Sequence, residues 1–326
     1  MHFPFVLARR ALVGLCAVAV LVPGTAGAVA AAPASPHPRY GEGYLIEGRQ
    51  VFPEGVAADA RYVYATSKAD GTVYRGAVGE ASLRRFLVGG QDGRTTATGI
   101  KTTGRRVLVA GAETGRFYVY AASGGALVAT YTVPHSERAT FLNDEVVVPT
   151  GDVYITDSLR PVIYRIPAAE VNAPPTGAHR TLQPAITLPG YADGFNANGI
   201  VATPDGKALL VVYTDTGALY RVDLATGVTR QVHLDRPLVN GDGLQLLGRT
   251  LYAARNFDNL VVTVRLSSDA MHGVTVAERS YPGADVPTTL ALSRGRLLAV
   301  NSQFDTFFQG APQTSEKFTI SSLPLR

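Results

Sequence analysis

A sixfold repetition of one short motif constrains this chain more than any other feature of its sequence. The motif opens with a polar residue, usually continues with Gly and an apolar residue, and leads into a run of β-forming residues. Its first residues are Glu54, Thr98, Asn143, Asn198, Asp242 and Thr288. They lie 44, 45, 55, 44 and 46 residues apart, and such spacing is typical of four-stranded propeller repeats. The longest interval contains residues 168–183, where a Pro-Pro-Thr-Gly segment predicts an inserted loop.

Each repeat carries short alternating segments joined by tight turns. In the first repeat, β-branched and aromatic residues at 62–66 precede an Asp-Gly turn at 69–71 and a second alternating run at 72–75. Such segments predict strand-turn-strand units, and no segment after the N-terminal region has a sustained helical period. The sequence therefore predicts an all-β fold, a six-bladed β-propeller over residues 45–326, in preference to a pair of β-sandwiches.

The N-terminus has the features of an export signal. Arg9 and Arg10 precede an apolar stretch at 11–22 that is short for a membrane span, and small residues at 28–30 fit a cleavage site. We therefore predict a signal peptide over residues 1–30, a secreted protein and no stable membrane anchoring. Both the general (Sec) and the twin-arginine (Tat) export routes stay open.

The composition argues against disulfides, cysteine metal sites and nucleic-acid partners. Residues 31–44 are rich in Ala and Pro and predict a disordered spacer. Cys16 is the only cysteine and lies in the predicted signal peptide, so disulfides and cysteine metal sites are excluded from the mature protein. The net charge of +4 comes without a basic run, so we expect no nucleic-acid partner. We expect a monomer that acts on a small-molecule substrate.

The first residues of the repeats suggest a metal site. The innermost strand of each propeller blade lines the axis, so residues at equivalent repeat positions converge there. Glu54, Asn143, Asn198 and Asp242 supply carboxylate and amide oxygens, which are the ligands that Ca²⁺ prefers. Asn and Asp beside Gly are also common turn residues, but Glu54 is not a turn residue. We predict that these four residues bind Ca²⁺, with other divalent cations as alternatives.

Longer motifs in four of the repeats add a resemblance. They are Phe-Pro-Glu-Gly at 52–55, Leu-Asn-Asp-Glu-Val at 142–146, Gly-Asp-Val-Tyr-Ile-Thr-Asp-Ser at 151–158, Asn-Ala-Asn-Gly-Ile at 196–200, Pro-Asp-Gly-Lys at 204–207 and Gly-Asp-Gly-Leu at 241–244. In these motifs the chain resembles the senescence marker protein/gluconolactonase family of six-bladed calcium propellers, over about residues 45 to 310.

The resemblance implies roles for the matching residues. Glu54, Asn198 and Asp242 would be direct metal ligands, and Asn143 a ligand or a substrate contact beside the metal. Asp242 matches the aspartate that acts as general base on water in the family's lactonases, so Asp242 and Asn143 are the predicted catalytic residues. A carboxylate beside a cation is a weak base. Attack by a metal-bound hydroxide, or a second carboxylate as the base, therefore stays open as an alternative.

One departure from the family bears on the substrate. The family commonly has Arg two residues before the Asn of the third repeat, and this chain has Phe141 there. An apolar ring cannot hydrogen-bond sugar hydroxyls, so we expect a more apolar or aromatic ligand than an aldonolactone. Further phenylalanines in segments that could line one face are Phe195, Phe257, Phe304, Phe307 and Phe308.

The sequence as a whole predicts a secreted, Ca²⁺-dependent hydrolase of lactones or related esters. Two other functions stay open, because propellers host many activities. One is a non-hydrolytic cyclase or isomerase that acts on a secondary metabolite in the same pocket. The other is a ligand-binding propeller in which the metal is structural.

Overall fold

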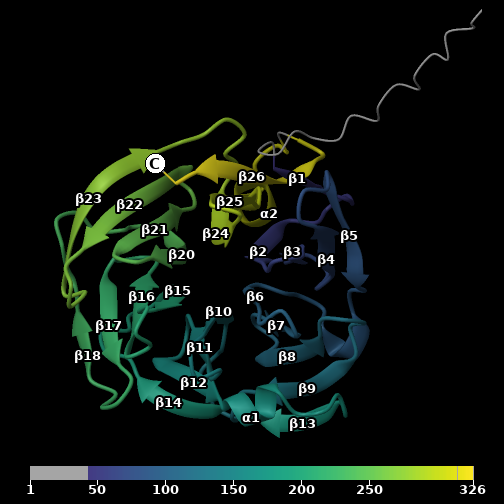
Figure 1. Ribbon diagram of the computed structural model, residues 1–326, viewed down its shortest axis with the longest axis horizontal. Coiled ribbons are helices and arrows are strands. Elements are labelled where there is room, and N and C mark those ends of the chain that lie inside the picture. The colour runs from purple at the N-terminus through teal and green to yellow at the C-terminus, as the bar shows by residue number, and fades with distance from the viewer. Residues whose placement is uncertain (1–42, 314, 326) are drawn as a thin grey trace, which may run out of the picture. The chain divides into compact units, whose positions relative to one another are not determined.

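The computed structural model describes residues 43–313 and 315–325, which form an almost entirely β-stranded body (Figure 1). The predicted signal peptide and all but the end of the predicted spacer lie outside the described residues. The first strand, β1 (Tyr44–Ile46), begins one residue before the expected start of the folded domain. None of the helices in the described part is long and apolar enough to cross a membrane.

The strands form consecutive groups of four antiparallel neighbours, which we call units one to six in chain order. Unit one contains β2 (Pro53–Ala58), β3 (Tyr62–Ser67), β4 (Val73–Ala77) and β5 (Ser82–Leu87). Unit two contains β6 (Ile100–Thr102), β7 (Arg106–Ala110), β8 (Arg116–Ala121) and β9 (Leu127–Thr132). Unit three contains β10 (Leu142–Val147), β11 (Val153–Asp157), β12 (Val162–Ile166) and β14 (Gln183–Thr187).

The remaining three units follow the same plan. Unit four contains β15 (Ala197–Ala202), β16 (Ala208–Tyr213), β17 (Leu219–Asp223) and β18 (Thr229–Gln231). Unit five contains β20 (Gly241–Leu247), β21 (Thr250–Arg255), β22 (Leu260–Leu266) and β23 (His272–Arg279). Unit six contains β24 (Pro287–Ser293), β25 (Arg296–Asn301), β26 (Phe318–Pro324) and, from the other end of the chain, β1.

The first strands of the six units surround a central axis (Figure 1). Each of them contacts the first strands of the two neighbouring units, in the closed cycle β2, β6, β10, β15, β20, β24 and back to β2. The first residue of each sequence motif is the second residue of one of these strands, except for Thr98, which lies two residues before β6. Equivalent positions of the repeat are therefore brought to one axis, as the period predicts.

Three strands connect neighbouring units along their outer edges. β1 pairs antiparallel with β26 of unit six and parallel with β5 of unit one, so it joins the two ends of the chain. β13 (Ala178–Thr181) leaves unit three to pair parallel with β9 of unit two. β19 (His233–Leu234) leaves unit four to pair parallel with β23 of unit five.

The segment at 168–183 differs from the inserted loop that the sequence predicts. It contains the short helix α1 (Ala168–Val171), and β13 follows the Pro-Pro-Thr-Gly turn. The reason is that an extended segment beside the unpaired edge of β9 can satisfy its backbone hydrogen bonds there. Residues 178–181 carry no period that distinguishes such a strand from a loop.

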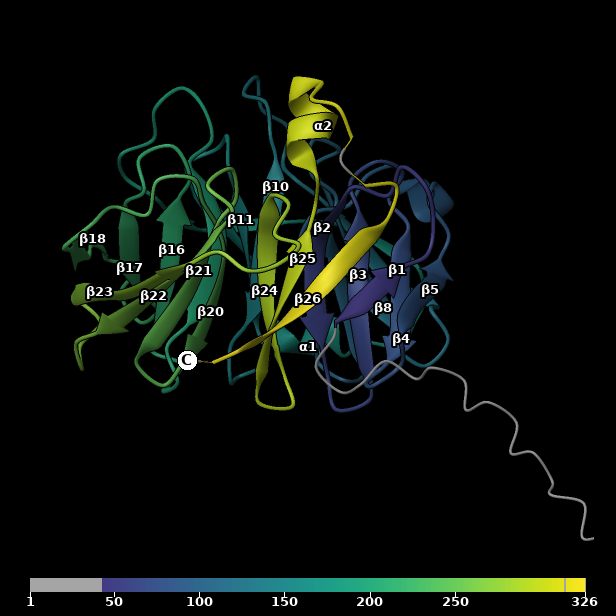
Figure 2. The same cartoon turned by 90° about the horizontal axis from the view of Figure 1, so that it is seen from above.

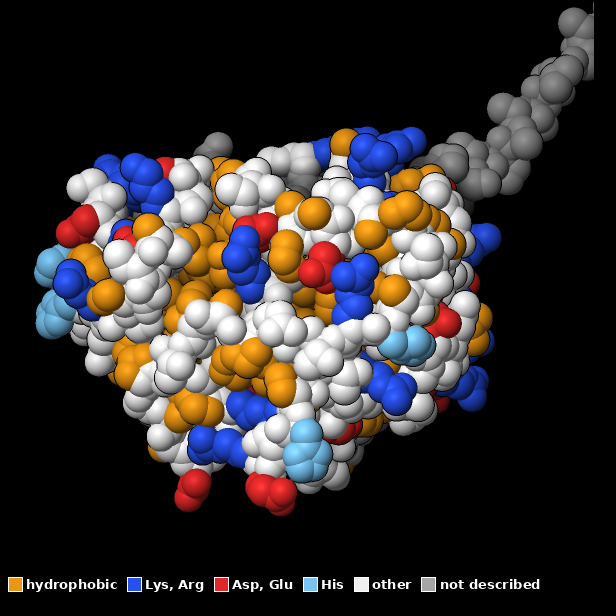
Figure 3. Space-filling model, turned by 90° about the horizontal axis from the view of Figure 1, so that it is seen from below, with side chains coloured by type: hydrophobic (Ala, Val, Ile, Leu, Met, Phe, Trp, Pro, Cys, Tyr) orange, Lys and Arg blue, Asp and Glu red, His pale blue; other side chains and the backbone are white. Residues whose placement is uncertain are grey.

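Apolar cores lie between neighbouring units rather than in one central cluster. The interface of units one and six buries residues such as Val56, Leu298 and Phe318. The two other interfaces linked by edge strands, two with three and four with five, hold the next largest clusters. On the side drawn in Figure 3, basic and acidic side chains are interspersed among neutral and apolar ones.

The two ends of the axis differ. At one end the first strands begin and the second strands finish, because the two run antiparallel. The helix α2 (Phe304–Gln309) follows β25 and projects from this end (Figure 2). We call it the α2 end. A 3₁₀ turn at Gln91–Gly93 precedes the first strand of unit two.

Candidate metal centre

The four predicted ligand residues lie at the starts of four first strands and are buried. Glu54, Asn143, Asn198 and Asp242 are each no more than 5% exposed. In each of the strands that carry them, the pairing register shifts at this point, as in a β-bulge. A bulge re-aims a side chain, so the same local irregularity places each of these residues.

One oxygen of each of these side chains has no hydrogen-bond partner among the described residues. The four atoms are Glu54 Oε2, Asn143 Oδ1, Asn198 Oδ1 and Asp242 Oδ1. A buried acceptor without a partner costs about 1–3 kcal/mol, and four around one axis are rare in a folded protein. A cation bound by these oxygens would remove that cost.

The amide groups are held so that their oxygens stay free. Asn143 Nδ2 donates to Ser158 Oγ at 2.9 Å, and Asn198 Nδ2 donates to Thr214 Oγ1 at 3.0 Å. Ser158 Oγ in turn donates, at 2.7 Å, to the carbonyl of Ala197, a residue of the next unit. Each amide is thus fixed by a hydroxyl that also links neighbouring units.

Asp242 is positioned by a residue that the sequence analysis assigned no role in the site. Asn256 Nδ2 donates to Asp242 Oδ2 at 2.8 Å, and Asn256 Oδ1 accepts the backbone N–H of Phe257 at 2.7 Å. Both polar atoms of this buried amide are therefore used, and Asp242 Oδ1 is the oxygen left free. In sequence, Asn256 belongs to the polar turn after β21 and carries no signal that separates it from an ordinary turn residue.

The electrostatics of the centre are those of crowded acids. Burial, followed by repulsion from Asp242 and Asp144, raises the pKa of Glu54 well above its ordinary value. Burial is also the largest cause that raises the pKa of Asp242 to about 7, and Asp144 adds to it, while the hydrogen bond from Asn256 lowers it. Two carboxyl groups that disfavour each other's charge form a site that attracts a cation.

A second charged group, which the sequence does not single out, interacts with Glu54 of the centre. Lys101 on β6 forms an ion pair with Asp144, with Nζ 2.5 Å from Oδ1. Glu145 is fully buried and neither carboxyl oxygen has a hydrogen-bond partner among the described residues. Burial raises its pKa, and Lys101 opposes that rise. The available sequence signal was that Asp144 and Glu145 replace the Gly and the apolar residue of the motif.

The glycine of the motif has a packing role. A Cβ atom on this glycine would lie 2.1–2.7 Å from the carbonyl oxygen of the first motif residue in the next unit. The pairs are Gly55 with Thr98, Gly99 with Asn143, Gly199 with Asp242 and Gly243 with Thr288. Glycine is therefore required where neighbouring first strands approach each other most closely.

The two threonines of the motif are not part of the donor set. Thr98 Oγ1 donates to the Leu142 carbonyl at 2.8 Å, and Thr288 Oγ1 donates to the Glu54 carbonyl at 2.6 Å. Their hydroxyls join neighbouring first strands, so they close the ring rather than face a ligand. Asp157, in the motif at 151–158 of the third repeat, accepts backbone N–H groups of Phe141, Leu159 and Arg160 and so stabilises a turn.

The donor set suits a hard cation. Among the described residues, no three His, Cys, Asp or Glu side chains form a group that could bind a metal on their own. The candidate centre depends on two amide oxygens in addition to two carboxylates, a combination that is typical of Ca²⁺ and unlike Zn²⁺ sites. The residues present therefore fit the predicted calcium ion.

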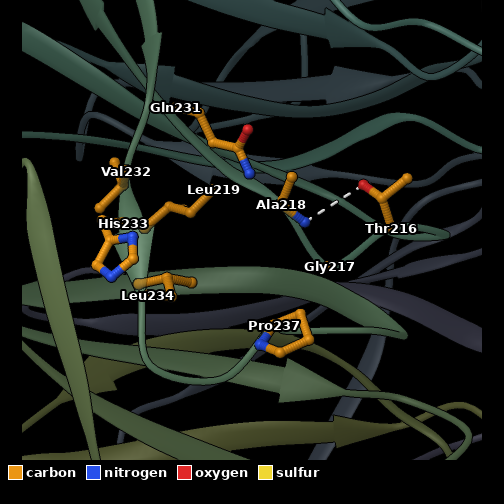
Figure 4. A pocket seen from close by; sticks show the side chains of 9 residues that line it. All are labelled: Thr216, Gly217, Ala218, Leu219, Gln231, Val232, His233, Leu234 and Pro237. Atoms are coloured by element: carbon orange, nitrogen blue, oxygen red, sulfur yellow. Dashed lines mark hydrogen bonds between the residues drawn. The ribbon is translucent and has the colours of Figure 1, made fainter.

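Two hollows lie away from the four oxygens. One of about 390 Å³ is lined by later parts of β6, β10, β15 and β20, including Lys101, at the end of the axis opposite α2. The other, of about 450 Å³, is lined by residues 216–219 of unit four and by the segment that contains β19, including His233 and Pro237 (Figure 4). Neither is lined by any of the four predicted ligands.

No family model matches the chain, and no curated protein matches it. Several solved structures share its fold. The Malassezia sympodialis allergen Mala s 1 has a TM-score of 0.66 and 14% identity, covering 86% of this chain and 95% of the allergen. A catalytically inactive H270A virginiamycin B lyase from Staphylococcus aureus, with quinupristin, has a TM-score of 0.58 and 14% identity over 87% and 88% of the two chains.

A third similar structure is regucalcin from Agrobacterium tumefaciens, described as a calcium-binding protein. Its TM-score is 0.57 at 18% identity, over 87% of this chain and 95% of that protein. At these identities the likeness shows the fold alone, an almost all-β, propeller-like arrangement. The three proteins have different reported properties, so the fold does not choose among functions.

Proposed function

We propose that the chain is a six-bladed β-propeller that binds one divalent cation, Ca²⁺ in the first place, and hydrolyses a lactone or a related ester. The observation that carries the proposal is the set of four buried oxygens without hydrogen-bond partners, on Glu54, Asn143, Asn198 and Asp242. The family resemblance of the surrounding motifs supports the reaction, and the fold shared with regucalcin is consistent with the cation.

The four protein oxygens would leave coordination positions of the cation free for a substrate. Ca²⁺ takes six to eight oxygen ligands, and the four side chains supply one free oxygen each. The other positions would be filled by water or by substrate oxygen. A bound Ca²⁺ would polarise the ester carbonyl and stabilise the negative charge that develops on its oxygen.

The chain's own residues would do the remaining work. Asn256 holds Asp242 through Oδ2, which fixes the carboxylate in place for accepting the proton of the attacking water. Asn143 is held by Ser158 with its amide oxygen free, so it would bind the cation or orient the substrate. Lys101 partly compensates the charge of three buried carboxyl groups, those of Glu54, Asp144 and Glu145, and so limits the positive charge that the centre needs.

We also propose that the protein is secreted after removal of residues 1–30. The support is the order of Arg9 and Arg10, the apolar stretch and the small residues at 28–30. Intact-mass measurement on protein recovered from the culture medium tests this, and a mass that includes residue 1 would overturn it.

The function is tested by metal analysis, thermal unfolding and turnover on wild type, Glu54→Gln and the surface control Glu137→Gln. We expect about one calcium ion per wild-type chain and a melting temperature that rises with calcium, since a ligand at 100 times its Kd stabilises by about 2.7 kcal/mol. Glu54→Gln should lose both effects, whereas Glu137→Gln, at an exposed position, should keep them.

Turnover separates the remaining functions. Calcium-dependent hydrolysis of a lactone and aryl-ester panel that Asp242→Asn abolishes would support the hydrolase. Calcium binding without turnover would support a ligand-binding propeller with a structural metal, and a product of unchanged mass would support a cyclase or isomerase. Wild-type protein that neither retains calcium nor responds to it would contradict the metal centre.

A further inference from the structure

Exposed phenylalanine side chains gather at the α2 end of the axis. Among the described residues, the exposed ones are Phe195, Phe257, Phe307 and Phe308, at 36–56% exposure. Phe195 lies just before the first strand of unit four, Phe257 in the turn after β21, and the other two in α2. All these connections lie at the end where the first strands begin (Figure 2).

The rings form pairs next to the residues of the candidate metal centre. Phe141 and Phe195 meet edge to face with centroids 5.0 Å apart. They precede Asn143 by two residues and Asn198 by three, so the segments that carry the rings also carry the free oxygens. On unit six, Phe307 lies 4.8 Å from Phe308 and also 4.8 Å from Phe52, which precedes Glu54 by two residues.

Polar side chains hold the backbone of three of these aromatic residues. The backbone N–H of Phe141 donates to Asp157 Oδ1 at 3.0 Å, and that of Phe195 donates to Asp215 Oδ2 at 2.8 Å. The N–H of Phe257 donates to Asn256 Oδ1 at 2.7 Å. The backbone that carries these rings is therefore held before any ligand arrives, which lowers the entropic cost of binding.

A cation near one of these rings is already paired with an acid of the protein. Lys68 Nζ lies 5.6 Å from the centroid of the Phe141 ring and donates to Glu113 at 2.9 Å and to Thr96 at 3.0 Å. Its charge is compensated by Glu113, so this arrangement does not favour an anionic ligand. Lys68 and Glu113 are thus bonded to each other, whereas Phe195, Phe257, Phe307 and Phe308 have exposed surface.

We propose that these phenylalanines form an aromatic rim that binds an aryl or similarly flat apolar substituent of the substrate. This rests on the proposed function, in which the ester carbonyl lies at the four oxygens below the rim. A pocket with apolar walls and a few convergent polar groups is the usual design of small-molecule sites. The substrate class is then aryl-substituted lactones or esters rather than polyhydroxylated ones.

The experiment compares γ-phenyl-γ-butyrolactone with γ-butyrolactone, which share the reacting ring and differ only by a phenyl group. We expect wild type to prefer the phenyl compound by at least about tenfold in kcat/KM, since burying a ring is worth more than 1.4 kcal/mol. Phe195→Ala should remove most of this preference, chiefly by raising KM for the phenyl compound. Val274→Ala, at an exposed apolar position on outer strand β23, should keep the preference.

The two proposals fail in different ways. Hydrolysis of both lactones with equal kcat/KM, or equal loss on both in Phe195→Ala, would overturn the rim and leave the hydrolase intact. If neither lactone is hydrolysed, titration calorimetry with γ-phenyl-γ-butyrolactone decides about the rim alone. Binding that weakens about tenfold in Phe195→Ala and not in Val274→Ala would support the rim, and absence of binding to wild type would overturn it.

Discussion

At the scale of single residues, the candidate centre is built from ligands and from the groups that orient them. An amide can present either its oxygen or its nitrogen to the axis, and sequence does not say which. In the structure, Ser158 and Thr214 accept from the nitrogens of Asn143 and Asn198, which leaves both oxygens free. Residue type and position in the repeat thus predict the donors. The orientation of the two amides depends on hydroxyls 15 and 16 residues away.

Asn256 provides a residue-scale prediction. Asn256→Ala removes the donor to Asp242 Oδ2 without touching the free oxygens. We expect the calcium dissociation constant to rise about 10- to 100-fold, as is usual when a partner that orients a metal ligand is lost. Isothermal titration with calcium measures this. Asn172→Ala, at an exposed asparagine beyond α1, is the control, and equal affinities in both variants would contradict the role of Asn256.

At the scale of elements, the first strands explain why the motif has its form. The first strands of units one, three, four, five and six each show a register shift near their motif residue, and in units one, two, four and five the following glycine packs against the neighbouring first strand. Two units lack this glycine: in unit three Asp144 stands in its place and pairs with Lys101 of β6, and in unit six Thr289 stands there. The motif therefore serves two purposes: its polar residue supplies the candidate metal centre, and its glycine allows neighbouring first strands to pack closely.

Gly199 tests the packing requirement. A Cβ atom there would lie 2.1 Å from the Asp242 carbonyl oxygen, a backbone atom that cannot move aside. We expect Gly199→Ala to lower the free energy of unfolding by about 2–3 kcal/mol or more, as overpacking does. Gly124→Ala, where a Cβ meets nothing within 4 Å, should be neutral or stabilising by up to about 1 kcal/mol. Urea unfolding of both variants measures this, and similar values for the two would contradict the packing role.

At the scale of the whole molecule, the ring is closed by the two ends of the chain. β1 completes unit six beside β26 and also pairs with β5 of unit one. Together with β13 and β19, it links alternate interfaces, and these interfaces hold the larger apolar clusters. Among the clusters of described residues, the smallest includes Tyr252 and Leu290 and lies between units five and six, and no strand in the described part of the chain pairs across this interface.

Closure by β1 makes a prediction for overall stability. Ile46 is buried in the cluster between units one and six, whereas its neighbour Leu45 is 37% exposed. We expect Ile46→Ala to cost about 2–5 kcal/mol, as for other buried large-to-small changes, and Leu45→Ala to cost less than about 1 kcal/mol. Thermal and denaturant unfolding compare them. An equally small effect of both changes would mean that β1 contributes little to closure.

The sequence by itself determined the features that repeat locally. Strand alternation, Asp-Gly turns and a motif spaced 44–46 residues in four of five intervals predicted an all-β fold, which is confirmed. The first position of the motif pointed to Glu54, Asn143, Asn198 and Asp242, whose role as calcium ligands stays a prediction. These signals are readable because they depend on neighbours within one strand or turn.

The tertiary structure alone decided what depends on contacts between units. The pairing of Lys101 with Asp144, the orientation of Asp242 by Asn256 and the pairings of β1 and β13 join segments far apart in sequence or in different turns. No local period encodes them, because each depends on how closely two units approach once the ring has closed. The physical reason is that a repeat specifies each unit, whereas closure specifies which side chains meet.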